Sequence, residues 1–323
     1  MASWGGHTLP GTFFIIFGIF YAFKFTRSYL KRPRTGQRNN GLFYCCKGKI
    51  PCSGMVIEGV VKVVFVSIGI LVELFYPGAP MGRLHDSASG NFTHPMNWQH
   101  ATMYFFFGLS GITDIIAFEA KHVVPPGLDR IGGALALFIE GYLFFFHLHG
   151  RSHIDTRVHI LLVLTVWPSA LIAFAECLVM NRRNILHILE MMHTTLLIAQ
   201  GTWFWQAAYI LYPPGAQPWD PCMMHENDTG HVDGHSDSIP EGDCNEAGEM
   251  NLMFITLFWS WHIAACFTFV GLIYFLMYKF LKIRGQLDPR FSSGYEHMNG
   301  GKITSSTPLN TGLLSNGEED DEL

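Results

Sequence analysis

Charged residues are scarce in this sequence: only 15% of its 323 residues are Asp, Glu, Lys or Arg, whereas 49% are hydrophobic. Soluble domains usually carry about a quarter charged residues, so the composition argues against a soluble protein. Alternating apolar and polar stretches separated by turns, which would indicate a membrane β-barrel, are also missing. Because no basic residue precedes the first apolar run and no small-residue cleavage site follows it, we expect no cleavable signal peptide.

Long apolar runs are what the sequence has instead. A helix of about 20 mainly apolar residues is long enough to cross the hydrocarbon core of a bilayer. The runs predict an all-α polytopic membrane protein with seven transmembrane helices, over residues 9–29, 55–76, 96–118, 129–149, 156–179, 185–212 and 250–280. We expect these helices to form one membrane domain, residues 1–284, followed by a disordered cytoplasmic tail, residues 285–323.

Two features of the loops predict how the chain is oriented in the membrane. The segment 24–54 carries eight basic residues and no acidic one, and such an excess of Lys and Arg is typical of cytoplasmic loops. The two glycosylation acceptor sequences, at Asn91 and Asn227, fall in loops that this assignment places on the opposite side. We therefore expect a lumenal or extracellular amino terminus and a cytoplasmic carboxyl terminus.

The loops also contain two groups of cysteines. Residues 213–248 form an acidic lumenal loop without Lys or Arg, in which Cys222 and Cys244 could form a disulfide. Candidates for palmitoylation are the three cysteines beside the basic segment, Cys45, Cys46 and Cys52. Free thiols are the alternative for both groups.

The tail contains two short patterns that could serve trafficking or signalling. Tyr295 and Met298 fit the tyrosine pattern that clathrin adaptors recognise, which makes these adaptors candidate partners. Ser315 precedes the acidic run 318–321 and is a candidate phosphorylation site. One alternative function is therefore a scaffold that acts through this tail.

Each apolar run contains a few polar residues, which recur at helical spacing. Ionisable side chains are costly inside a membrane, so they normally face a protein interior, a cavity or a partner; Glu58 and Lys62, four residues apart, are expected to pair. Helical phase and depth predict one polar pocket near the outer end of the bundle, lined by His7, Asn97, His100, Tyr104, Glu140, His147, Asp155, His159, Asn251 and His262. We expect Arg151, between the fourth and fifth runs, to lie at the membrane interface.

Three interpretations of this pocket are open. The first is a hydrogen-bonded network that only fixes helix packing. The second is a metal site, in which His100, His147, His159 and His262 would hold zinc and the protein would be a metal-dependent membrane hydrolase. The third is a non-catalytic pocket that binds a small ligand or ion, or senses lumenal pH, since histidine changes charge near a pH of about 6.5. We favour the third.

Several motifs together resemble the transmembrane protein 45 family. They are residues 6–11, 96–100, 102–104, 140–141, 147–155, 200–206, 218–220, 251–256 and 261–262. The resemblance implies a multi-pass protein of Golgi, endosomal or lysosomal membranes, and it implies no established biochemical activity, substrate or catalytic residue. We accordingly expect the lipid bilayer, and no nucleic acid, as a partner; the sequence does not indicate the oligomeric state or a cofactor, apart from the zinc of the second interpretation.

Overall fold

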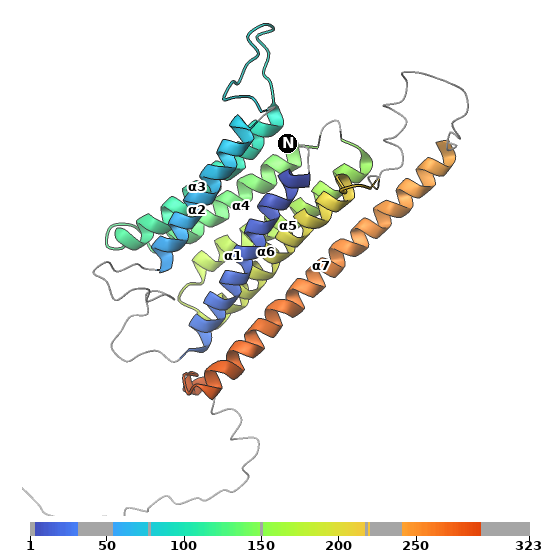
Figure 1. The fold of residues 1–323 in the computed structure, drawn as a ribbon. Coiled ribbons are helices and arrows are strands. Elements are labelled where there is room, and N and C mark those ends of the chain that lie inside the picture. The colour runs from blue at the N-terminus through green and yellow to red at the C-terminus, as the bar shows by residue number, and fades with distance from the viewer. Residues whose placement is uncertain are drawn as a thin grey trace, which may run out of the picture.

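The computed structural model describes residues 4–31, 54–76, 79–148, 151–216, 219 and 241–291, and for residues 241–247 it describes the backbone only. Within these ranges the chain forms seven α-helices and a short 3-10 helix (Figure 1). Their bounds are α1 Trp4–Leu30, α2 Gly54–Phe75, α3 Pro95–Glu119, α4 Leu128–Phe146, α5 His153–Leu178, α6 Arg183–Leu211, α7 Glu241–Ile283 and η1 Pro289–Phe291. The prediction of an all-α fold is confirmed.

Five helices of the described part of the chain are long and apolar enough to cross a membrane: α1, α2, α3, α5 and residues 248–283 of α7. The protein is therefore a multi-pass membrane protein. The other two helices are more polar, because α4 carries Asp129, Arg130 and Glu140 and α6 carries several His, Gln and Thr residues. The most polar of these side chains are turned inward: Glu140, Glu190 and Gln200 are all buried in the bundle.

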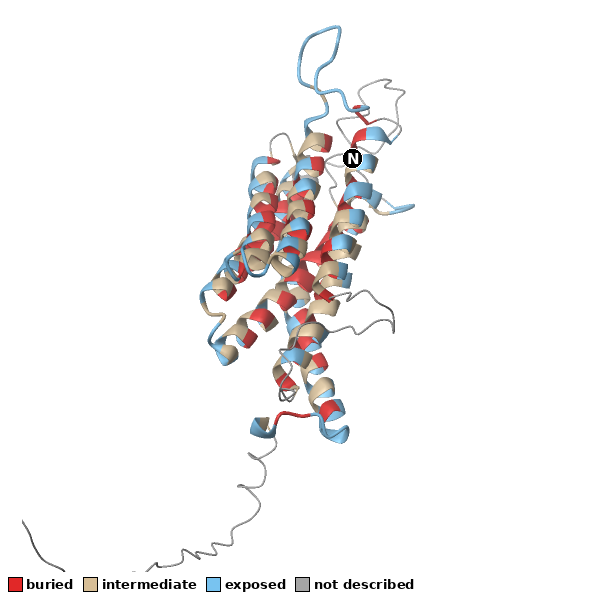
Figure 2. Ribbon diagram, turned by 90° about the vertical axis from the view of Figure 1, so that its left-hand side faces the viewer, coloured by how far each residue is buried: buried red, intermediate tan, exposed pale blue. Residues whose placement is uncertain are grey.

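Six of the helices pack in the order α1, α6, α5, α4, α3, α2, each against the next, and α7 lies along the outside of α1, α5 and α6 (Figure 1). Buried residues gather where the helices face one another, while the outer surfaces are exposed (Figure 2). Many exposed residues there are large and apolar, among them Leu171, Trp261 and Phe267. Such a surface suits contact with lipid.

Glycine residues set the two closest helix pairs. A Cβ atom on Gly11 of α1 would lie 2.8 Å from the carbonyl oxygen of Gly201 on α6, and one on Gly201 would lie 2.7 Å from the carbonyl oxygen of Gly11. Gly59 of α2 and Gly111 of α3 approach in the same way, at 2.5 and 2.7 Å. Small residues at such contacts let two helices pack backbone to backbone.

The consecutive helices α1 and α2 are not a packed pair in the described structure, and we call the line between them the α1/α2 seam. Side chains meet across it. The rings of Phe13 and Phe65 are in contact at a tilt of 43°, with their centroids 4.7 Å apart. Nearer the carboxyl end of α1, the side chains of Tyr21 and Lys24 both donate to the carboxylate of Glu58, each at 2.5 Å. The seam thus separates the glycine-packed pair α1/α6 from the pair α2/α3.

Two segments differ from the expected domain bounds. Helix α7 begins at Glu241, so the last residues of the expected loop 213–248 are helical. The first residues of the expected disordered tail are ordered: Leu287 packs on Leu30 and Leu281, and the amide of Asp288 donates to the carbonyl of Leu30 at 2.9 Å. Hydrogen bonds from Arg290 lower the pKa of Asp288 to about 2, which keeps this carboxylate charged at neutral pH.

Several predicted modification sites lie outside the described residues, and the structure does not bear on them. They are the acceptor Asn227, the cysteines Cys45, Cys46, Cys52 and Cys222, the tail residues Tyr295, Met298 and Ser315, and the side chain of Cys244.

Candidate functional site

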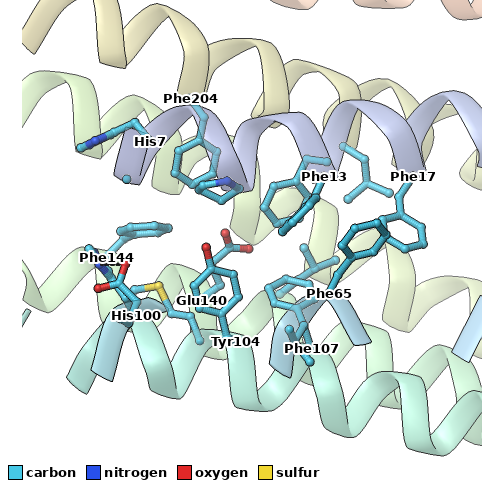
Figure 3. Close-up of a pocket in the computed structure, with 18 of the residues that line it drawn as sticks. His7, Phe13, Phe17, Phe65, His100, Tyr104, Phe107, Glu140, Phe144 and Phe204 are labelled. Carbon is cyan, nitrogen blue, oxygen red and sulfur yellow. Dashed lines mark ion pairs between the residues drawn. The ribbon is translucent and has the colours of Figure 1, made fainter. Parts of the chain in front are cut away.

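A large cavity lies inside the ring of helices, between the pair α1/α6 and the pair α2/α3 (Figure 3). Its empty volume is about 1300 Å³, which includes space open to its surroundings. Aromatic rings form much of its wall, and the Phe and Tyr residues that line it are Phe13, Phe14, Phe17, Tyr21, Phe65, Tyr104, Phe107, Phe144, Phe204 and Tyr212. The cavity is therefore suited to a mainly apolar molecule of moderate size.

Histidines from four helices gather at one end of this cavity. The ring centroids of His100 and His147 are 5.5 Å apart, those of His147 and His159 are 6.2 Å apart, and those of His7 and His159 are 5.9 Å apart. His100 lies 3.3 Å from the carboxylate of Glu73, and Nδ1 of His147 contacts the side-chain oxygen of Gln99. We call this group, with Glu73, the histidine end of the pocket.

The start of α5 completes the histidine end. Ser152 caps this helix by accepting the amide of Asp155, so the carboxylate of Asp155 lies in the first turn. Asp155 then binds two cationic or polar neighbours, Arg151 at 2.7 Å and Nδ1 of His159 at 2.8 Å. Arg151 also donates to the carbonyl of His147 at 2.8 Å and lines the cavity. Arg151 thus faces the cavity from the turn before α5, where its ion pair with Asp155 holds it.

Glu140 projects into the middle of the pocket from α4, between the two ends (Figure 3). Only 2% of the residue is exposed. Its two oxygens accept the same amide group of Gln200, at 2.8 and 2.9 Å. Among the residues that the structure describes, no cationic side chain forms an ion pair with it.

A second cavity, with an empty volume of about 1060 Å³, adjoins the pocket at the opposite end of the bundle. Most of its charged groups are paired: Lys62 lies 3.5 Å from Glu58 and 2.7 Å from Asp114, which confirms the expected Glu58 and Lys62 pair. Arg130 binds Glu176 and Glu190, the latter at 2.9 Å. These pairs join α2 to α3 and α4 to α5 and α6.

Six of the ten predicted pocket residues line the cavity, namely His7, His100, Tyr104, Glu140, His147 and His159. Two others support it from behind: Asn97 donates to the carboxylate of Glu73 at 3.0 Å, and Asp155 holds Arg151 and His159. The remaining two lie elsewhere. Asn251 donates to the carbonyl of Trp219 at 2.7 Å, and His262 packs against Trp203 beside the hydroxyl of Thr202.

The four proposed zinc ligands therefore do not come together. His262 lies on α7, which packs outside the ring, whereas His100, His147 and His159 face the pocket within it. Each of these three already has a polar neighbour, and no group of three or more His, Cys, Asp or Glu side chains in the described part of the chain could hold a metal ion. The described residues therefore provide no set of ligands for the zinc site of the second interpretation.

Two features of the site were not among the predicted pocket residues: the charged side chains Glu73 and Arg151, and the aromatic rings of the wall. Glu73 and Arg151 both line the cavity. Helical phase places Glu73 on one stripe with Glu58 and Lys62, and this signal could have assigned it to the pocket. The aromatic wall has no such signal. Phe105 and Phe107 are alike in hydropathy, yet Phe107 lines the pocket while Phe105 is 58% exposed on the lipid-facing surface.

The fold and this site define a class: a multi-pass helical membrane protein with a cavity, partly lined by aromatic rings, inside its bundle. The names of related proteins agree that it is a membrane protein. Residues 126–275, which run from the start of α4 into α7, match a family described as "Family of unknown function (DUF716)". The match includes Glu140, His147 and His159 but not His7 or His100.

Curated relatives are membrane proteins by name. Transmembrane epididymal protein 1A of Mus musculus is 26% identical over 269 residues, which cover 81% of this chain and 77% of the relative. Transmembrane epididymal protein 1 of Homo sapiens is 28% identical over 222 residues, which cover 67% of this chain and 69% of the relative. The expected membership of the transmembrane protein 45 family is wrong, since the matched family and these relatives carry other descriptions. The Golgi, endosomal or lysosomal location was implied by that resemblance alone.

Proposed function

We propose that this protein binds one small, mainly apolar molecule in the cavity, with a polar group of that molecule at the histidine end, and that it does so without catalysing a reaction. The observation that supports this most is that one cavity has two parts, a long part lined by aromatic rings, which we call the aromatic length, and the polar histidine end. Pockets for small molecules are typically apolar with a few converging polar groups. A network that served only packing would need no such volume.

All seven helices cross the bilayer in this proposal. The 19 residues of α4 are about 28 Å long at the rise of an α-helix, close to the thickness of the hydrocarbon core. Its buried charges are screened from lipid by neighbouring helices, which is where membrane proteins place such groups. Helix α6, with 29 residues, is longer still.

The histidine end faces the lumen or the outside of the cell in this proposal. Its support is the excess of Lys and Arg in the segment 24–54, which follows the opposite end of α1. Asn91 is exposed in the loop between α2 and α3, at the histidine end. We expect glycosidase treatment to increase the gel mobility of the protein from eukaryotic cells, and Asn91→Gln to remove part or all of that increase. If Asn91→Gln leaves the glycosidase shift unchanged, this support for the orientation is lost.

Filling the cavity tests the binding proposal. Gly133 lines the pocket, and a Cβ atom there would meet only the hydroxyl of Ser110, at 4.0 Å. Gly133→Leu should therefore occupy the cavity without a clash at its backbone. We expect it to weaken binding of an uncharged, environment-sensitive naphthalene dye to detergent-purified protein by at least about tenfold, because the side chain replaces the dye in the aromatic length.

The matched control is Gly271→Leu. Gly271 is exposed on α7, and a Cβ atom there would meet nothing within 4 Å. The control adds the same side chain to a membrane helix outside the cavity, so dye binding should stay within about twofold of the original protein. Equal dye affinity in both variants, or no saturable binding by the original protein, would contradict the proposal.

A further inference from the structure

Buried carboxylates in this bundle have cationic partners, with one exception in the described part of the chain. Glu58 and Asp114 bind Lys62, Asp155 binds Arg151, and Glu73 lies beside His100. Glu176 and Glu190 share Arg130, and Asp288 binds Arg290. Glu140 has the amide of Gln200 alone. It is also among the least exposed of these acids, at 2%.

The lysine and the arginine that line the same cavity are already engaged. Lys62 binds Glu58 and Asp114, and Arg151 binds Asp155. Moving one of them to Glu140 would leave its present acid without a partner, which costs about as much as it gains. If Glu140 is ionised, its counter-charge has to come from outside the described part of the chain.

Aromatic rings surround the space beside Glu140. Phe14 lies 5.4 Å from Phe107 and 5.9 Å from Phe204, centroid to centroid, and Phe144 lies 5.8 Å from Phe204. Figure 3 shows Tyr104 and Phe144 on the same cavity as the carboxylate of Glu140. The faces of aromatic rings attract cations, and cages of such rings recognise ammonium groups.

This surrounding distinguishes between kinds of cation. A bare metal ion such as Ca²⁺ needs about six to eight oxygen ligands, and the phenylalanine rings that form much of the wall supply none. An ammonium carried on an apolar body needs one counter-charge and tolerates aromatic contacts in place of water. The oxygen of Gln200 is buried and has no hydrogen-bond partner among the described residues, so an acceptor is also left beside the carboxylate.

We propose that the pocket selects lipophilic organic cations, ammonium compounds with an apolar body, and that Glu140 is the counter-ion that binds their nitrogen. The ammonium lies against the carboxylate of Glu140 between the aromatic rings, the apolar body extends along the aromatic length, and any further polar group lies at the histidine end. This inference rests on the proposed binding function and adds the charge of the ligand to it.

The test uses two probes that differ in one atom. One is a naphthylalkyl trimethylammonium compound, and the other is its uncharged tert-butyl analogue, in which carbon replaces nitrogen. We expect the original protein to bind the cation about 30-fold more tightly than the analogue, as measured by fluorescence titration in detergent. In Glu140→Gln the preference should fall to about twofold or less, while the affinity for the uncharged analogue is unchanged.

Glu119→Gln is the matched control, because Glu119 is an exposed acid at the far end of α3 and the substitution removes the same charge. It should keep the full preference. Glu140→Asp, which retains the carboxylate, should keep a preference for the cation at lower affinity, so a folding defect in Glu140→Gln would not hide the result. Size-exclusion profiles identify any such defect.

The outcomes separate the two proposals. If both probes bind equally to the original protein, the cation inference is overturned and the proposed function stands. A preference that survives in Glu140→Gln also overturns the inference, since the charge is then recognised elsewhere. If neither probe binds saturably, both proposals fail.

Discussion

Replacing Arg130 with leucine is expected to lower the free energy of unfolding by about 3–5 kcal/mol. Arg130 of α4 is the shared partner of Glu176 on α5 and Glu190 on α6, and both acids are buried. Removing the guanidinium leaves two carboxylates whose remaining basic neighbours are histidines, His193 beside Glu176 and His187 beside Glu190. Unfolding by dodecyl sulfate in mixed micelles would measure the change.

Two comparisons isolate the cause. Arg182→Leu removes an exposed arginine at the same end of the bundle, whose side chain makes no capping bond to α6, and should cost less than about 0.5 kcal/mol. The triple variant Arg130→Leu, Glu176→Gln, Glu190→Gln removes the orphaned charges as well and should recover most of the lost stability. If Arg130→Leu costs no more than Arg182→Leu, this ion-pair cluster does not hold α4 to α5 and α6.

The second large effect is expected where α1 and α6 touch. In Gly201→Leu the Cβ atom would lie 2.7 Å from the carbonyl oxygen of Gly11 and 2.8 Å from the amide nitrogen of Ile15. Both atoms belong to the backbone, so the clash is relieved only if the two helices separate. We expect a loss of about 2–3 kcal/mol, near the upper end for overpacking, in the same unfolding assay.

Gly271→Leu again supplies the control, because it adds the same side chain to an exposed position of α7. A loss of stability there would indicate a general cost of leucine in these helices. Gly201→Leu should also disturb the pocket, since Phe204, one turn along α6, forms part of its wall. A Gly201→Leu protein as stable as the control would refute the close packing of α1 and α6.

The helices could be predicted from the sequence because apolar length is a local property. The first apolar run, residues 9–29, became helix Trp4–Leu30, and the fourth, residues 129–149, became Leu128–Phe146. The largest difference is at α7, which begins at Glu241 rather than at residue 250. The residues added there are polar, and hydropathy marks where a helix enters lipid but not where it begins.

The site was predicted only in part, because helical phase identifies an inward face without saying which helices adjoin. Glu140 and His147 share a face of α4 and both reach the cavity. His262 also lies on a polar stripe, yet its helix packs outside the ring, so its inward direction points to Thr202 of α6. Which residues an inward-facing side chain meets depends on which helices pack side by side, and the spacing of residues within one helix does not contain that information.

The ring of six helices closes at the α1/α2 seam, between two helices that are consecutive in the sequence. Every other junction in the ring, from α1 through α6, α5, α4 and α3 to α2, is a packed pair of helices. The contacts across the seam include the tilted ring pair Phe13 and Phe65, the carboxylate of Glu58, which binds Tyr21 and Lys24, and Lys62 over the ring of Tyr21. Widening the seam would break no helix-to-helix interface, whereas widening any other junction would. The seam is therefore the junction of the ring that side-chain contacts hold without packing of the two helices.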